Sequence, residues 1–149
     1  MTINKTVNRL IFILSLVGLA VTAFLAYEYI QSGPIVCPIT GSGCDLVRNS
    51  TFSKLFGIDL PYFGIAFYLT TAFISVWLTH TYHRVIDLLR LLASFSAVMF
   101  GVYLTFLEAF VIKAYCIWCI ISFIVSVIIF GLCMLEFFKT PKMTPKADE

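Results

Sequence analysis

The sequence predicts an all-α membrane protein, built as a bundle of four transmembrane helices. Of its 149 residues, 60% are hydrophobic and only 12% are charged, and the mean hydropathy is +0.99. A soluble domain of this length could not bury so much apolar surface, so the excess must face lipid. Four apolar runs are also long enough to cross a bilayer, which takes about 20 helical residues.

The four runs are predicted to be helices because lipid cannot satisfy open backbone groups. The first run has no charge before Glu28, and the charges of the third lie near its ends. The first run is too long for a signal-peptide core and has a poor cleavage site, so we expect an uncleaved anchor. In chain order the predicted helices are residues 10–30, 62–78, 86–110 and 114–138.

Basic residues predict the orientation of this bundle. The positive-inside rule places the end that carries most of them, and with it both termini, in the cytoplasm. The loop 31–61 and the connection 108–114 then face outward. We expect residues 1–138 to form a single membrane domain and residues 139–149 a polar, disordered cytoplasmic tail. The basic residues at the cytoplasmic end are Lys5, Arg9, Arg84, Arg90, Lys139, Lys142 and Lys146.

Four of the five cysteines form two close pairs at the predicted outer face. Cys37 and Cys44 lie in the first outer loop, and Cys116 and Cys119 form a C-x-x-C motif near the start of the last helix. Helix N-termini and C-x-x-C spacing both favour the thiolate. Disulfides persist in oxidising compartments, so two thiol pairs at one boundary suggest an electron relay.

The residues alone leave other interpretations open. Taken by itself, the loop pair is equally well explained as a static disulfide. Four thiols also match the ligand count of a zinc site, but such a site is unusual at a lipid boundary, and no metal is predicted. Cys133 has no partner at a suitable spacing and is predicted to be a small buried hydrophobe. Glu28 and Glu108 are interpreted as ordinary carboxylates of the outer interface.

The outer loop contains a pattern that predicts a short amphipathic helix lying on the membrane and ending at Gly57. Such a helix would cap the bundle and close a dry pocket above it. Ser50 would lie either on its inner face, as a hydrogen-bond donor, or on its wet face, and the periodicity favours neither. The apolar residues of the pattern are Leu46, Val47, Phe52, Leu55 and Phe56.

The order of these elements resembles the vitamin K epoxide reductase family, over about residues 8–138. The marks are four helices, a loop cysteine pair with a Cys44-Asp45 step, a following Ser50, and a C-x-x-C that opens the last helix. In this chain that motif reads Cys116-Ile117-Trp118-Cys119. Quinone-linked disulfide oxidases of the DsbB type carry the C-x-x-C in the first outer loop, which is the reverse order.

The resemblance implies a relay that ends on a membrane quinone, either ubiquinone or menaquinone. Cys37 would receive electrons from a reduced partner protein, and Cys44 would exchange with Cys116. Cys119, one turn deeper, would reduce the quinone in a pocket below Ser50. The residues expected to bind the quinone are Ser50, Phe63, Tyr68, Tyr103 and Tyr115.

Two departures from the animal members argue against an epoxide as the substrate. Leu60 stands where they carry Asn, and Ser122-Phe123-Ile124 stands where they carry Thr-Tyr-Ala. The expected function is therefore quinone-dependent reoxidation of a separate thioredoxin-like or DsbA-like protein at the outer face of a bacterial or archaeal plasma membrane. Reduction of vitamin K quinone or epoxide, as in the animal members, is the alternative.

A second alternative is a non-enzymatic four-helix membrane protein, such as a transporter or assembly subunit, with structural disulfides. Transporters usually carry intramembrane charges or broken helices. The sequence places no charge at mid-depth in any of the four runs. The enzyme interpretation is therefore preferred, and exchange by the thiols would discriminate between the two classes.

Overall fold

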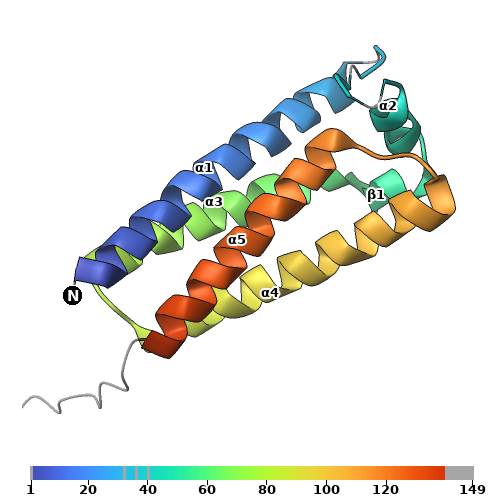
Figure 1. The fold of residues 1–149 in the computed structure, drawn as a ribbon. Helices are drawn as coiled ribbons and strands as arrows, with labels where there is room; N and C mark the ends of the chain where they lie inside the picture. Colours follow the sequence, from blue (N-terminus) through green and yellow to red (C-terminus); the bar gives the residue numbers. More distant parts are fainter. Residues whose placement is uncertain (1, 32, 36, 40, 140–149) are drawn as a thin grey trace, which may run out of the picture.

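The computed structural model describes residues 2–31, 33–35, 37–39 and 41–139, and its main feature is a bundle of four long helices (Figure 1). All four are long and apolar enough to cross a membrane, which confirms the predicted fold class. Of the expected polar tail, residues 139–149, Lys139 is the last residue of the fourth long helix, and residues 140–149 lie outside the described residues. The long helices are α1 (Thr2–Ile30), α3 (Leu60–His80), α4 (Arg84–Phe106) and α5 (Ile117–Lys139).

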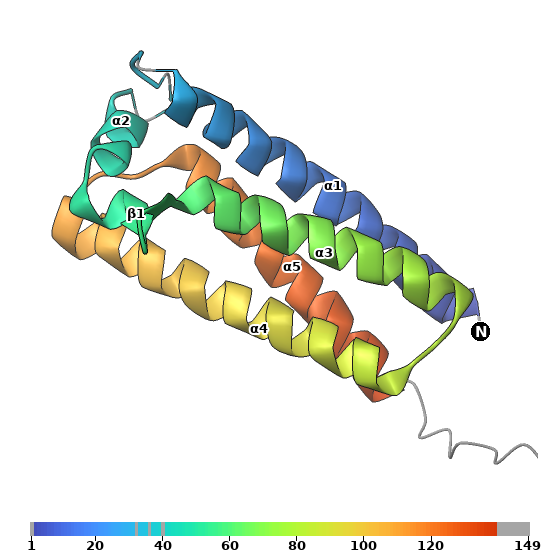
Figure 2. The ribbon, with the colours of Figure 1, turned by 180° about the vertical axis from the view of Figure 1, so that it is seen from behind.

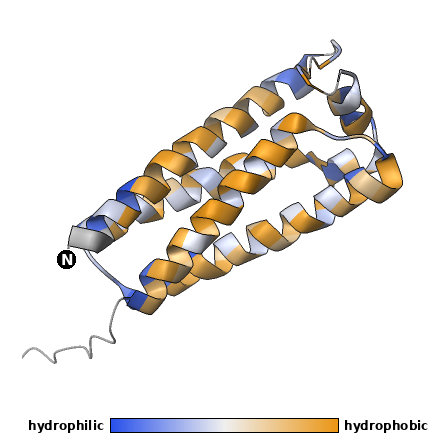
Figure 3. Cartoon of the chain, in the orientation of Figure 1, coloured by the Kyte–Doolittle hydropathy of each residue, from blue (hydrophilic) through white to orange (hydrophobic). Residues whose placement is uncertain are grey.

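The helices run alternately up and down, so that two of the three connections meet at one end of the bundle and the short α3–α4 connection lies at the other (Figures 1 and 2). The ends of α1 and α4 and the starts of α3 and α5 share one end, which we call the thiol end. The start of α1 lies at the other end, which we call the Arg90 end. Apolar residues cover the helices along their length, and hydrophilic residues gather mainly at the two ends (Figure 3).

The bundle is unevenly packed. Helix α1 contacts α3 and α5 extensively, whereas α3 and α4 contact each other much less. Gly18 allows the close approach of α1 to α3, because a Cβ atom at this position would overlap the ring of the buried Tyr68. The weak contact between α3 and α4 leaves room for a cavity between them.

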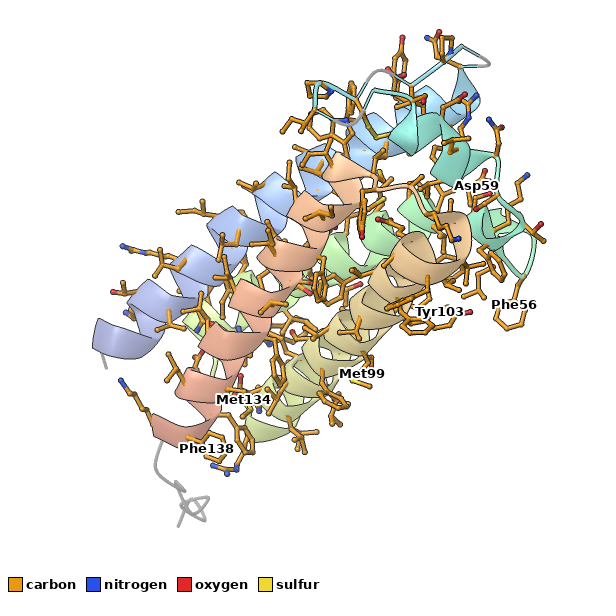
Figure 4. All side chains as sticks on the ribbon, turned by 45° about the vertical axis from the view of Figure 1, so that its right-hand side comes forward. Phe56, Asp59, Met99, Tyr103, Met134 and Phe138 are labelled. Atoms are coloured by element: carbon orange, nitrogen blue, oxygen red, sulfur yellow. A yellow bond between two sulfur atoms is a disulfide. The ribbon has the colours of Figure 1, made fainter. Side chains whose placement is uncertain are left out.

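The connection from α1 to α3 caps the thiol end. It contains the short helix α2 (Gly43–Arg48), a 3-10 turn (Thr51–Ser53) and a hairpin of β1 (Lys54–Leu55) and β2 (Ile58–Asp59). The predicted helix in this loop is therefore present, but it is capped by Asn49 and does not reach Gly57. Phe56 and Gly57 both have positive φ and form the hairpin turn, a conformation that a helix cannot include. Phe56 projects away from the bundle (Figure 4).

The connection from α4 to α5 also departs from the prediction. Helix α4 ends at Phe106 and continues as one π-helical turn, η2 (Leu107–Ile112), which Lys113 ends with a φ of 55°. Helix α5 then begins at Ile117 instead of residue 114, because Cys116 occupies the position that caps its N-terminus.

Arg90 joins all four long helices at the end opposite the four paired cysteines. Its guanidinium group is fully buried and donates to Asp87 Oδ1 at 2.6 Å and to Glu136 Oε2 at 2.7 Å. It also donates to Asn8 Oδ1 at 2.6 Å and to Ser75 Oγ at 3.4 Å. These charges, which the sequence placed near helix ends, are therefore enclosed by the bundle. Breaking such a network leaves charges buried without a partner.

We predict that Arg90→Ala lowers the free energy of unfolding in detergent by about 3–5 kcal/mol, because two buried carboxylates lose their cation. Thermal and denaturant unfolding would measure the change. The matched control is Arg9→Ala, which removes an exposed arginine from the same end and should have little effect. Equal stabilities for the two variants would contradict a clamping role for Arg90.

Candidate functional site

The four paired cysteines meet in one buried cluster at the thiol end. Cys37, Cys44 and Cys116 are among its core members, and Cys119 packs against it. Cys37 and Cys44 form a disulfide, whereas Cys116 and Cys119 are free thiols. Residues from α1, α2 and both connections at the thiol end surround the sulfur atoms. The remaining core members are Leu25, Ile35, Val47 and Ala114.

Arg48 fixes the cysteine loop to the end of α1. Its guanidinium group donates to the backbone oxygens of Glu28 and Gln31, both at 3.2 Å, and of Gly33 at 2.9 Å. Asp45 holds the same group with an ion pair of 3.2 Å. Asp45, which directly follows Cys44, therefore has a structural role, because it orients the arginine that anchors α2.

Cys116 caps the N-terminus of α5 with its side chain. The backbone N–H of Cys119 donates to Cys116 Sγ at 3.4 Å, and the N–H of Ile120 donates to the Cys116 oxygen at 3.1 Å. The hydrogen bond with the Cys119 side chain lowers the pKa of Cys116, and it outweighs burial, which raises it. The backbone N–H groups of Trp118 and Cys119 lower this pKa further, as expected at a helix N-terminus.

A cavity of about 440 Å³ lies next to this motif, between α3 and α4, with α5 on its third side. Cys119 lies in its wall, one helical turn below Cys116. The lining is largely apolar, including Phe67, Phe100 and Leu104. Its volume falls in the range of small-molecule sites, about 300–1,000 Å³. Cys119 therefore borders a cavity large enough to hold a small molecule.

Three of the five residues expected to bind the quinone line the cavity, namely Ser50, Phe63 and Tyr68. Tyr103 and Tyr115 do not, and both are about half exposed. Tyr103 lies on a different face of α4 from the residues that line the cavity. Tyr115 lies in the extended connection before α5, outside the cavity.

The polar groups among these residues are already engaged within the protein. Ser50 Oγ donates to the backbone oxygen of Val47 at 2.7 Å, so its hydrogen does not point freely into the cavity as the sequence allowed. The Tyr68 hydroxyl bridges to α5, with 2.8 Å to the Ser122 backbone oxygen and 2.9 Å to its Oγ. Both side chains therefore hold the walls of the cavity in place.

Sequence reasoning missed Glu108 and Tyr29. Glu108 was interpreted as an ordinary interfacial carboxylate, but it is only 4% exposed and lines the cavity. Its Oε2 accepts the backbone N–H of Cys116 at 3.3 Å. Tyr29 lines the same cavity from α1 and packs against the cysteine cluster. No local motif marks either residue, because the contacts arise from the π turn and from helix packing.

Cys133 lies apart from the other cysteines, at the Arg90 end. It is fully buried, with its sulfur 3.7 Å from Ser94 Oγ, which agrees with the prediction of a small buried residue. Within the described ranges, no group of three or more His, Cys, Asp and Glu side chains is arranged to hold a metal ion.

Comparison with known proteins agrees with this architecture. The model of the vitamin K epoxide reductase family matches residues 9–134. Thiol-disulfide oxidoreductase LTO1 from Arabidopsis thaliana is 38% identical over 47 residues. That match covers 32% of this chain and 12% of the plant protein, so the similarity spans only a small part of this relative's length.

We predict that alkylation of Cys116 in the reduced protein has its midpoint at a lower pH than alkylation of an ordinary cysteine, because its pKa is lowered. The thiolate is the reactive form, and a lowered pKa makes it available at lower pH. Cys119→Ala should move the midpoint upward, because it removes the largest cause of the lowered pKa. Mass spectrometry of labelled peptides would measure both midpoints, and Cys133→Ala is the matched control. A midpoint that did not respond to Cys119 would contradict this account.

Proposed function

Because the chain belongs to the vitamin K epoxide reductase family, we propose that it is a membrane oxidoreductase that carries electrons from protein thiols to a quinone. One observation carries this proposal, namely that Cys119 belongs to both the cysteine cluster and the wall of the cavity. A thiol in that position can exchange with Cys116 on one side and meet a lipid-soluble acceptor on the other. The name of the plant relative, a thiol-disulfide oxidoreductase, supports the same chemistry.

The relay begins with a dithiol on a separate thioredoxin-like or DsbA-like protein. Its thiolate attacks the Cys37–Cys44 disulfide, the partner leaves oxidised, and the loop pair becomes a dithiol. Cys44 then attacks the Cys116–Cys119 disulfide, which restores the loop disulfide and leaves the inner pair reduced. In the last step the Cys116–Cys119 bond forms again, and two electrons and two protons pass to the quinone.

The structure corresponds to one state of this relay. The loop disulfide is closed and the inner pair is reduced, which is the state that precedes electron transfer to the quinone. Both loop cysteines are buried, although attack by a partner requires an accessible sulfur. The partner must therefore displace part of the loop, in which Ile39 is largely exposed next to Cys37.

The cavity supports a quinone over an epoxide. Leu60 and Phe123 line it where the animal members have an amide and a phenol, and Ser122 is engaged with Tyr68. A mainly apolar wall suits an aromatic ring, and ubiquinone and menaquinone both satisfy this requirement.

We predict that the reduced protein converts a soluble quinone analogue to quinol under anaerobic conditions, with dithiothreitol as the donor. Cys119→Ser should abolish this reaction, because the inner disulfide can no longer form. Cys133→Ala should leave the rate near the wild-type value, since this thiol lies at the other end of the bundle. Undiminished quinol formation by Cys119→Ser would contradict the relay.

The same assay also tests whether the quinone binds in the cavity, by means of a substitution that narrows it. Ala97 lines the cavity from α4, so Ala97→Phe should raise the KM for the quinone about tenfold or more. The matched control is Ala23→Phe, on an exposed position of α1 that faces lipid. Equal KM values would place the quinone elsewhere.

We also propose that the thiol end faces outward from a bacterial or archaeal plasma membrane, because the basic residues gather at the Arg90 end. After mild reduction of whole cells, a membrane-impermeant thiol reagent should label Cys37 or Cys44 from outside. Cys133→Ala should not change that labelling. Labelling of the loop cysteines only in inverted vesicles would reverse the proposed orientation.

A further inference from the structure

Glu108 is a buried carboxylate in the wall of the cavity, beside the deeper thiol. The side chain is enclosed at the thiol end, where the cavity meets the cysteine cluster. Cys119 lines the same cavity as Glu108, whose Oε2 accepts the N–H of Cys116 at 3.3 Å. Ionisable residues inside a membrane bundle are costly and are found mainly where function uses them.

The π turn η2 brings Glu108 to this position. The N–H of Ala114 closes the turn on the Glu108 backbone oxygen at 3.2 Å, and the chain then returns so that Cys116 N–H reaches Glu108 Oε2. Turns of this kind inside helices occur frequently at functional sites. One carboxylate thereby bonds to the backbone of Cys116 and shares the cavity wall with Cys119.

The charge of Glu108 is not neutralised by a cation in the described part of the chain, where it forms no ion pair. The buried Glu136, by contrast, is paired with Arg90. The only backbone donor to the Glu108 side chain among the described residues is the N–H of Cys116. A carboxylate that served packing alone would not need to face a thiol and a ligand-sized cavity at once.

We propose that Glu108 carries a proton from the Cys119 thiol to the quinone, an inference that rests on the function proposed above. Cys116 enters the step as the thiolate and Cys119 as the thiol. Glu108 accepts the Cys119 proton as the two sulfurs bond, and it passes this proton to a quinone oxygen. A second proton comes from water, so one quinone, two electrons and two protons give quinol, and Glu108 ends ionised as it began.

Few other titratable groups of the described residues face Glu108. Cys116 and Cys119 lie on the α5 side, and Tyr29 lines the cavity from α1. Helix α2 packs against the π turn, and its charged groups, Asp45 and Arg48, are paired with each other. Lys113 follows at the end of the turn itself. Glu108 is therefore the carboxylate placed to receive the Cys119 proton.

The test compares Glu108→Gln and Glu108→Asp in stopped-flow oxidation of the reduced protein by a soluble quinone. Gln keeps an acceptor for the Cys116 N–H but cannot carry a proton, so oxidation should slow about 100-fold and lose its wild-type pH profile. Asp should recover part of the rate. The matched control, Glu28→Gln, removes a half-buried carboxylate from the same end and should behave like the wild type. A Gln variant within threefold of the wild type, with an unchanged pH profile, would overturn the inference.

A second readout does not depend on quinone turnover. The infrared difference between reduced and oxidised protein, poised with dithiothreitol and its oxidised form, should contain a shift of a carboxylate band as Cys119 loses its hydrogen. Glu108→Gln should remove that shift, and a spectrum unchanged by this substitution would also overturn the inference. If the wild type does not reduce quinone at all, the proposed function fails. If the wild type reduces quinone and the Glu108 variants do so at the same rate, the function stands and the proton carrier is another group.

Discussion

The first turn of α5 is the structural element on which the rest of the site depends. Cys116 caps that turn with its own sulfur, by accepting the N–H of Cys119 at 3.4 Å. This single arrangement directs one thiol into the cluster with the loop disulfide and the other into the cavity wall. It also exposes Cys116 to the positive end of the helix dipole, which favours its thiolate. The π turn, the loop and the cavity all surround this one capped helix end.

The two ends of the bundle have opposite characters, and both follow from the same four helices. At the Arg90 end, a buried guanidinium group holds residues of all four long helices within hydrogen-bonding distance. At the thiol end, α3 and α4 lie against a cavity instead of each other. A network that fixes one end allows the other to accommodate a cavity without the helices separating. The buried ion network thus stabilises one end of the bundle, and the cavity at the other end provides space for a ligand.

Hydropathy and the cysteine spacing were sufficient to predict the four helices and the two thiol pairs, because both signals are local. The extent of the loop helix was not predictable, since the positive φ of Phe56 depends on a hairpin that forms around it. The positions of Tyr103 and Tyr115 depend on which side of each segment meets the cavity. Glu108 and Arg90 were recognised only as charges near helix ends, because the groups that enclose them come from distant parts of the chain.

The Arg48 anchor has a consequence for the energetics of turnover. Three backbone oxygens of the α1 end and the segment after it accept from this one side chain, and none of these bonds involves a sulfur atom. The loop is therefore tethered by contacts that remain when its disulfide opens. An unanchored loop would regain chain entropy at each reduction and lose about 1–2 kcal/mol per residue when it ordered again. With the tether in place, the disulfide can open and close while α2 stays joined to the end of α1.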